Sequence, residues 1–297
     1  MKRDHKKIIV TFLLPLLFLY AVFQLYPLLL NLFYSMLNWN GITKTANFVG
    51  LDNYVEVLGD GLFWNAVKNS VLYAVAGTFF QVTVSFFLAY LVEYNTFKKK
   101  KMVRLVFIMP IVATSATIGI LMKSIFSYDG FVNTVISGVG LEKIEWLTEP
   151  KWAFLMIILV SVWKETGTLF IYWMAGFQMV SPAVIEASKV AGASEPAFVR
   201  YILIPTMKPV IFTVTSVAFL NALKMFDIIQ TLTSGGPYFS TDMISTYIYR
   251  TAFSSSFGAP RLSYASAAVV MCLVFLILCS GLIRFFQKKW KEGKEAC

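Results

Sequence analysis

The sequence has little charge, few cysteines and almost no histidine, and each shortage excludes a class of protein. Asp, Glu, Lys and Arg together make up only 14% of the 297 residues, against about a quarter in an average soluble domain. Hydrophobic residues make up 58%, and the mean hydropathy is +0.68. A soluble enzyme or nucleic-acid-binding domain is therefore disfavoured, and the composition indicates a protein embedded in a membrane.

The shortage of metal ligands and nucleophiles argues against catalysis by this chain. His5 is the single histidine, and the three cysteines include no C-x-x-C pair, so a structural zinc or haem site is disfavoured. No G-x-x-x-x-G-K-[ST] loop occurs, which disfavours ATP binding by that device. We therefore predict no catalytic residue, no metal site and no bound cofactor, and we interpret the chain as a non-enzyme.

Long apolar runs supply the fold prediction. Runs of about 20 apolar residues span a bilayer as helices, and six occur here, at about 8–30, 70–92, 105–126, 152–177, 210–229 and 264–286. The first follows a basic stretch as in a signal peptide, but it is too long and lacks a small-residue cleavage site, which favours a retained span. We predict an all-α, polytopic bundle of six transmembrane helices that forms a single domain over residues 1–297.

Basic residues predict the orientation of these spans. Of the 26 Lys and Arg residues, 17 lie in the termini and the loops assigned to the same side, and 6 lie in the loops of the other side. Because basic residues concentrate in cytoplasmic loops, both termini are expected in the cytoplasm. The net charge of +10 is then a topology signal, and we expect contact with membrane lipid and none with nucleic acid.

The segment 181–209 between spans four and five is too long for a simple connection. Ser181 can cap a helix that has Pro182 in its first turn, and Gly192 can supply a sharp turn or a close approach. A second short helix follows, which Pro205 is expected to end. The pattern predicts a cytoplasmic helix–turn–helix that either packs on its own bundle or docks in a groove of a partner.

This segment resembles the EAA loop of ABC importer permeases, whose usual form is E-A-A-x-x-x-G followed by I-x-L-P. The matching residues are Glu186, Ala187, Ser188, Gly192, Ile202 and Pro205. Ser188 stands where a second Ala is usual, Ala191 where Asp is common, and Ile204 where Leu precedes the proline. Two further segments, FVGLDNYVEVL after span one and Phe226-Asp227 with Ser234-Gly235-Gly236-Pro237, resemble the first permease of maltose-like sugar importers.

The resemblance implies a type I ABC importer permease fold in a bacterial cytoplasmic membrane, and it also implies partners. These are a second homologous permease, two ATPase subunits that would hold ATP and Mg, and an extracellular solute-binding protein. Glu186 would pair with a basic residue of the ATPase, Gly192 would allow close backbone approach, and Ala187 and Ala193 would be small contact residues. The alternative for Glu186 is a solvated loop carboxylate.

Polar residues inside the spans are costly, so they are candidates for the solute pathway. In span four these are Lys164, Glu165, Thr168, Tyr172 and Trp173, and in span five Asn221, Lys224 and Asp227. Adjacent helical residues point about 100° apart, so Lys164 and Glu165 need not pair with each other. Asn221, Lys224 and Asp227 are expected on one stripe of a helix. Structural ion pairs are the alternative for both charged sets, and Gln81, Thr114 and Thr117 are assigned to helix packing.

The functional prediction is a permease for a sugar or oligosaccharide, since Tyr or Trp beside hydrogen-bonding groups suits a sugar. A glycerophosphate or polyol-like solute is the alternative, with Lys164 meeting its anionic group. An independent secondary transporter that uses Lys164 and Glu165 as an ion-coupled relay is a further alternative, which the EAA-type loop disfavours. A membrane-embedded enzyme lacks a recognisable catalytic constellation.

Overall fold

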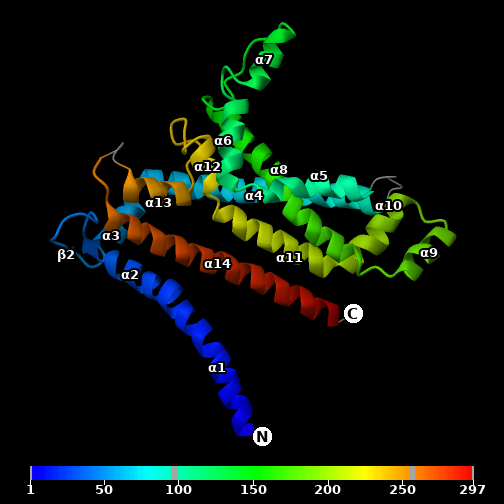
Figure 1. Ribbon diagram of the computed structural model, residues 1–297, viewed down its shortest axis with the longest axis horizontal. Coiled ribbons are helices and arrows are strands. Elements are labelled where there is room, and N and C mark those ends of the chain that lie inside the picture. The colour runs from blue at the N-terminus through cyan, green and yellow to red at the C-terminus, as the bar shows by residue number, and fades with distance from the viewer. Residues whose placement is uncertain (1, 95–99, 255–257, 296–297) are drawn as a thin grey trace. The chain divides into compact units, whose positions relative to one another are not determined.

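The computed structural model describes residues 2–94, 100–254 and 258–295, with side chains between residues 11 and 285, and nearly all of this is helix (Figure 1). The first elements are α1 (Lys2–Tyr20), η1 (Ala21–Leu25), α2 (Tyr26–Tyr34), β1 (Leu37–Asn38), β2 (Asn47–Phe48), α3 (Asp52–Gly59), α4 (Gly61–Tyr94), α5 (Lys100–Val112), α6 (Ser115–Ile125) and α7 (Phe131–Gly138). The rest are α8 (Pro150–Phe177), α9 (Pro182–Val190), α10 (Glu195–Phe198), η2 (Val199–Leu203), α11 (Ile204–Leu223), α12 (Asp227–Leu232), α13 (Ile244–Phe253) and α14 (Leu262–Glu295). The all-α prediction is confirmed, with a two-residue antiparallel pairing of β1 and β2 in addition.

The number of membrane-spanning helices agrees with the predicted six when one bent pair is included. Five helical stretches among the described residues are long and apolar enough to cross a bilayer: Thr11–Tyr34, Gly61–Tyr94, Pro150–Phe177, Glu195–Leu223 and Leu262–Phe285. The pair α5 and α6 is apolar enough together, but the two helices meet at 98°. The predicted span 105–126 is therefore broken rather than continuous.

The break in span three follows from a capping residue that the sequence analysis assigned to helix packing. Thr114 has an extended backbone, and its hydroxyl accepts a hydrogen bond from the Thr117 N–H at 3.2 Å. A threonine in this role ends one helix and begins the next, because its side chain replaces a missing backbone acceptor. Thr114 therefore starts α6, which packs on α12.

Span five differs from its prediction at both ends. Pro205 does not end the preceding helix: α10, η2 and α11 run on without interruption, and the π-helical turn of η2 lies directly before the proline. A π-helical turn changes the hydrogen-bond spacing by one residue and is a common device in bent helices. At the other end α11 stops at Leu223 instead of near residue 229.

The chain divides into two compact units, and the first comprises residues up to Phe63 with Tyr247–Ile277. Asn53 joins its connecting segments by donating hydrogen bonds to the carbonyls of Ser35 and Leu37, at 2.8 and 2.7 Å. Within this unit the stretch Thr11–Tyr34, from α1 to α2, is lined with exposed apolar side chains, and none of its residues is buried. The first span thus receives almost no packing from the rest of its own unit.

A polar cluster around Asp60 ties α3, α13 and the start of α14 together within the first unit. The Asp60 carboxylate accepts hydrogen bonds from the Tyr247 hydroxyl at 2.5 Å, the Tyr264 hydroxyl at 3.0 Å and the Leu62 N–H at 2.7 Å. Arg261 makes a two-armed ion pair with Glu56, at 2.7 and 2.6 Å. The bonds from Tyr247, Tyr264 and Arg261 connect residues about two hundred positions apart in the sequence.

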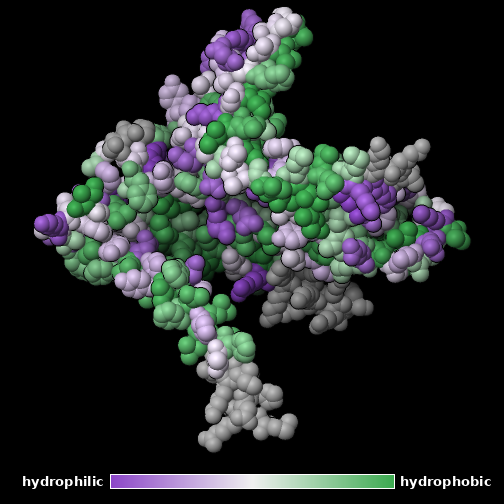
Figure 2. Space-filling model, in the orientation of Figure 1, coloured by the Kyte–Doolittle hydropathy of each residue, from purple (hydrophilic) through white to green (hydrophobic). Residues whose placement is uncertain are grey.

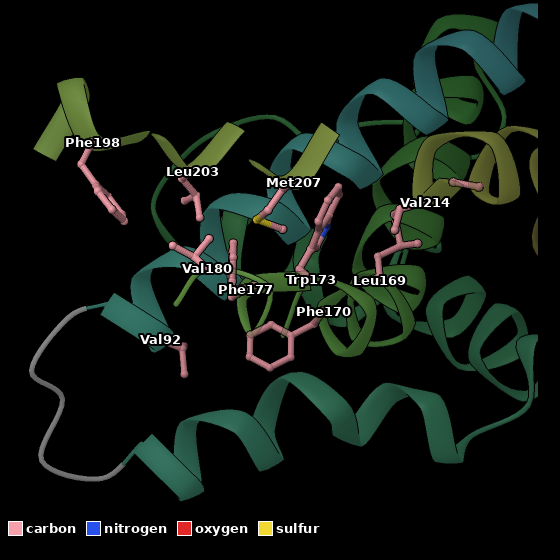
Figure 3. Packing of buried hydrophobic residues seen from close by; sticks show 12 residues of the cluster. Val92, Leu169, Phe170, Trp173, Phe177, Val180, Phe198, Leu203, Met207 and Val214 are labelled. Atoms are coloured by element: carbon pink, nitrogen blue, oxygen red, sulfur yellow. The ribbon is translucent and has the colours of Figure 1, made fainter. Parts of the chain in front are cut away.

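The second unit, Trp64–Thr246 with Leu278–Cys297, contains the main hydrophobic core. Figure 3 shows Trp173 and Phe177 of α8 meeting Leu203, Met207 and other side chains from η2 and α11. Trp173 is fully buried, and its indole N–H donates to the Ser85 hydroxyl of α4 at 2.8 Å. The helix α8 therefore lies at the centre of the unit.

Two glycines let α8 approach its neighbours closely. A Cβ on Gly167 would lie 2.6 Å from the backbone oxygen of Phe107 in α5, and one on Gly176 would lie 2.7 Å from Met207 in α11. Small residues at helix contacts are the usual means of close packing in membranes. These two glycines therefore allow α5 and α11 to approach α8 closely.

Candidate functional site

Four of the predicted pathway residues line one cavity in the second unit. Glu165, Thr168 and Tyr172 come from α8, and Asn221 comes from α11. Gln81 of α4 adds a further amide, and the remaining wall is apolar. The cavity encloses about 70 Å³. Carboxylate, hydroxyl and amide groups thus converge in a bundle that is otherwise apolar, which is the composition of a site for a hydrogen-bonding solute.

Lys164 and Glu165 form an ion pair with each other, although adjacent helical residues diverge. The Lys164 Nζ lies 2.7 Å from Glu165 Oε1, and the two side chains are 17% and 25% exposed. Their length lets them meet beside the helix. Glu165 lies on the cavity wall and Lys164 does not. The Glu165 carboxylate therefore lines the cavity, whereas the Lys164 ammonium group is paired with that carboxylate and does not line the cavity.

A larger hollow adjoins this cavity along the same helices. It encloses about 480 Å³ between α8 and α11, and it shares Tyr172 and Val217 with the smaller cavity. Thr213 is its other hydroxyl-bearing residue, and the remaining wall consists of small and apolar side chains. The two hollows together make one face of α8 and α11 a continuous, mainly apolar track with polar groups at one end.

Three predicted pathway residues lie elsewhere. Trp173 belongs to the buried core described above, because its ring packs edge-on against Phe86 and it has no exposed surface. Lys224 caps the end of α11, whereas Asp227 begins α12. The expected helical stripe through Asn221, Lys224 and Asp227 is therefore wrong, since the helix ends at Leu223. No ion pair joins Lys224 and Asp227 in the described part of the chain.

Sequence reasoning missed the role of Gln81. The residue is 3% exposed, its amide nitrogen lies 3.4 Å from the Tyr73 hydroxyl, and it lines the same cavity as Glu165. A lone glutamine in a long apolar run is a signal that could have suggested this, since a buried amide needs partners. Gln81 was predicted to serve helix packing, because the sequence of its own helix does not show which side of that helix faces α8.

The EAA-type segment folds as the predicted helix and turn, closed at both ends by capping bonds. The Ser181 hydroxyl accepts from the Val184 N–H at the start of α9. At its end, the Ala193 N–H donates to the Ser188 carbonyl and the Gly192 N–H to the Lys189 carbonyl, both at 3.0 Å. This is the Schellman arrangement, which needs a left-handed residue after the helix. Gly192 supplies it with a φ of +72°.

The side chains of α9 divide into an outward and an inward set. Glu186, Ala187 and Ala193 are exposed, and Val190 is 90% exposed. Ser188 is buried, and its hydroxyl donates to the Ile185 carbonyl at 2.7 Å. Ile202 packs against the core cluster, and Pro205 is half-buried at the start of α11. The exposed set leaves a small apolar surface around one carboxylate, free to meet another protein.

The sequence matches the family described as "Binding-protein-dependent transport system inner membrane component" over residues 61–292. It is 32% identical to the lactose transport system permease protein LacF of Rhizobium radiobacter, over 95% of this chain and 94% of that protein. It is 28% identical to the multiple sugar-binding transport system permease protein MsmF of Streptococcus mutans, over 96% and 95% of the two chains.

The fold is also similar to a solved structure. A chain of a bacterial ABC transporter involved in the import of the acidic polysaccharide alginate superposes with a TM-score of 0.80 and 25% identity, covering 95% of this chain and 96% of that one. The family match over residues 61–292 includes the EAA-type segment and both α8 and α11, which line the cavity. The protein therefore belongs to the family of binding-protein-dependent transport system inner membrane components, and it is a multi-pass permease subunit of an ABC importer.

Proposed function

We propose that this permease carries a neutral sugar or oligosaccharide, handed over by an extracellular solute-binding protein, through the cavity between α8 and α11. The observation that carries the proposal is the convergence of Glu165, Thr168, Tyr172, Asn221 and Gln81 on one cavity wall. Hydroxyl groups of a sugar donate to carboxylate and amide oxygens, and the tyrosine ring offers a flat surface for the apolar face of the sugar. Lactose and multiple-sugar permeases among the relatives support this class of solute.

The ion pair favours the neutral sugar over the glycerophosphate alternative. In that alternative Lys164 would meet the anionic group of the solute. The Lys164 ammonium instead lies on Glu165, and only the carboxylate borders the cavity. An anionic group in the cavity would meet this carboxylate and no free ammonium group, so the geometry favours an uncharged solute. The alginate importer carries an acidic polysaccharide, and we expect this chain to differ from it in charge preference.

The size of the cavity supports a second permease as partner. Sites for small molecules usually enclose about 300–1,000 Å³, whereas the polar cavity encloses about 70 Å³. A second permease facing α8 and α11 would complete the site. The first span offers it a contact surface, because the described side chains of Thr11–Tyr34 include many exposed apolar ones. Both termini and α9 are proposed on the cytoplasmic side, as the Lys and Arg distribution predicts.

Coupling to ATP hydrolysis is assigned to α9. Its exposed Glu186 would pair with a basic residue of an ATPase subunit, and Val190 and Ala187 would enter an apolar groove of that subunit. ATP and Mg would be bound by two copies of the ATPase, and this chain would contribute no catalytic residue. The Schellman hydrogen bonds at Gly192 support this role, because they keep the end of α9 from unfolding locally while it is bound to another subunit.

The experiment that tests the coupling role is Glu186→Lys in the assembled importer, reconstituted in vesicles with its binding protein. We expect sugar uptake to fall at least about tenfold while the ATPase still hydrolyses ATP, since a desolvated charge pair is replaced by like charges. The matched control is Glu142→Lys, a charge reversal at an exposed glutamate of the loop after α7, which should transport normally. Unchanged uptake in Glu186→Lys would contradict the docking role.

A further inference from the structure

A third hollow lies between α4, α5 and α8, away from the polar cavity, and its wall is almost wholly apolar. It encloses about 470 Å³ and is lined by Phe80 and Val84 of α4, Val106 and Phe107 of α5, and Leu159 and Trp163 of α8, among others. Thr166 carries the hydroxyl on this wall, and that hydroxyl already donates to the Val162 carbonyl at 2.6 Å. The hollow therefore offers little to a hydrogen-bonding solute.

The hollow is open to the outer surface of the bundle. Phe80, Leu159 and Trp163 are each 47% exposed, and Val106 is 64% exposed. Figure 2 shows hydrophobic surface over α5, which gives way to a hydrophilic patch near the beginning of that helix. In a protein with apolar spans, such a groove faces the acyl chains of the bilayer.

One end of the groove is basic. The helix α5 begins with Lys100, Lys101 and Arg104, and Lys100, Arg104 and Phe107 share a face because they are four and three residues apart. Glu93 balances part of this charge: its carboxylate lies 2.6 Å from Arg104, and its carbonyl accepts from Lys100 at 2.6 Å. Lys101 is exposed, so the start of α5 keeps an excess of positive charge within about two helical turns of the groove wall.

We propose that this groove binds an anionic phospholipid, with one acyl chain along Phe80, Val106 and Leu159 and the phosphate at Lys100 and Arg104. A long apolar chain with a negative group at one end matches a groove that is apolar along its length and basic at one end. Basic pockets between transmembrane helices on the cytoplasmic side are recognised sites for anionic headgroups.

Charge also distinguishes a lipid from a transmembrane helix of a partner protein in this groove. Such a helix would carry its own Lys and Arg residues at the same membrane side, because basic residues concentrate there in membrane proteins generally. Like charges would then meet at Lys100 and Arg104, which is unfavourable at close range. The basic end therefore favours a negatively charged occupant.

The test uses the purified importer in mild detergent, with dioleoyl phosphatidylglycerol and dioleoyl phosphatidylcholine as probes and native mass spectrometry to measure binding. We expect phosphatidylglycerol to bind at least about tenfold more tightly. The double variant Lys100→Gln/Arg104→Gln should weaken phosphatidylglycerol about fivefold for each charge removed and leave phosphatidylcholine unchanged. The control Lys68→Gln/Lys123→Gln removes two exposed lysines outside the groove and should change neither.

A second variant tests the acyl-chain part of the site. Leu159→Trp fills the groove from a half-exposed position and should reduce the binding of both lipids, whereas Leu121→Trp, on an exposed leucine of α6, should not. If Leu159→Trp fails to fold, Leu155→Phe serves the same purpose from the next turn of α8. Equal binding of the two lipids, or full binding in the filled variants, would overturn the proposal.

Crosslinking tests the alternative occupant of the groove, a transmembrane helix of a partner protein. Leu159→Cys is placed in a chain whose Cys272, Cys279 and Cys297 are replaced by Ser, and the importer is assembled and oxidised. We expect no disulfide between this position and single cysteines placed along the spans of the second permease. A crosslinked pair in high yield would show that a protein helix fills the groove and would overturn the lipid assignment.

Discussion

At the scale of single residues, the site depends on which neighbour each polar side chain meets. Glu165 borders the cavity because it sits one turn from Thr168 and two from Tyr172 on α8, and its charge is tolerated because Lys164 neutralises it at 2.7 Å. Trp173 is one residue beyond Tyr172 and lies in the core instead. Sequence reasoning could group these residues as polar within one span, but it could not assign their faces.

Substitutions at the cavity wall and in the core should have different effects, the first on sugar uptake and the second on thermal stability. Asn221→Ala should lower sugar uptake about tenfold or more with little change in the melting temperature, because Asn221 is at the wall of a hollow rather than in the core. Trp173→Phe should do the reverse: it loses the bond to Ser85 and costs about 1–2 kcal/mol of stability, while the preference among sugars stays unchanged. Uptake in vesicles and thermal unfolding in detergent measure the two effects, and a matching loss of uptake in both variants would contradict the assignment.

The ion pair gives a sharper variant of the same test. Glu165→Gln should destabilise the protein by about 1–3 kcal/mol, because Lys164, whose side chain is only 17% exposed, is left as an unpaired charge. The double variant Lys164→Met/Glu165→Gln should recover most of that stability, since both charges are removed together, while sugar uptake stays low. Thermal unfolding and uptake are measured on the two variants; recovery of both properties in the double variant would mean that Glu165 is structural only.

The turn after α9 should respond to backbone conformation rather than to side-chain size. Gly192 has a φ of +72° and open space where a Cβ would point, so Gly192→Val should cost about 1–2 kcal/mol from the backbone alone. Gly192→Asn should retain most function, because asparagine tolerates the left-handed region. The measurement is ATP hydrolysis stimulated by the loaded binding protein. Equal loss in both variants would indicate that contact with the ATPase, and not the turn, selects glycine here.

The Asp60 cluster should make the first unit sensitive to acid. Burial raises the pKa of the Asp60 carboxyl, but the hydrogen bonds from Tyr247, the Leu62 N–H and Tyr264 outweigh burial and hold that pKa below its ordinary value. The hydrogen bond from Arg261 lowers the pKa of Glu56 in the same way, against a smaller effect of burial. A lowered carboxyl pKa means that this stabilisation is complete at neutral pH and is lost as the pH falls below about 4.

Tyr247→Phe tests the cluster directly. Loss of a hydrogen bond to a half-buried carboxylate should lower the free energy of unfolding by about 1.5 kcal/mol at pH 7, and the difference from the unsubstituted protein should shrink as Asp60 becomes protonated at acid pH. Tyr238→Phe, at a tyrosine that is 91% exposed, is the control and should be neutral. A difference that is the same at pH 7 and pH 3.5 would show that packing, and not the carboxylate, makes Tyr247 stabilising.

At the scale of elements, α8 organises the second unit. It packs against α5 through Gly167, against α11 through Gly176, and against α4 through Trp173 and Ser85. The apolar runs predicted the existence of each span, because twenty apolar residues leave few alternatives. They could not predict the bend at Thr114 or the uninterrupted passage from η2 into α11, since a single hydroxyl cap and a π-helical turn decide these locally.

The close approach of α5 and α8 leads to a stability prediction. A methyl group at Gly167 would lie 2.6 Å from a backbone oxygen, so Gly167→Ala should cost about 1–3 kcal/mol through overpacking. Gly138→Ala is the matched control, because no atom lies within 4 Å of its added Cβ. Thermal unfolding of the purified protein compares the two. A Gly167→Ala variant as stable as Gly138→Ala would contradict the tight α5–α8 contact.

At the scale of the whole molecule, the chain has the features of one subunit of a larger machine. Its first span exposes apolar side chains along its length, its polar cavity is smaller than a sugar site usually is, and its cap-closed helix α9 points an exposed carboxylate away from its own core. The resemblance of the EAA-type loop to that of ABC importer permeases predicted a second permease, two ATPase subunits and a solute-binding protein from a few residues. Size and exposure, which the sequence does not contain, indicate where the partners would bind.

The most direct test of this account is affinity purification of the chain from its native membrane in mild detergent, with every co-purifying protein identified and its stoichiometry measured. The account predicts one second permease, two copies of an ATPase, and ATP hydrolysis that a sugar-loaded binding protein stimulates. Recovery of the chain alone, stable, homogeneous and able to move solute without an ATPase, would contradict it and would indicate an independent secondary transporter.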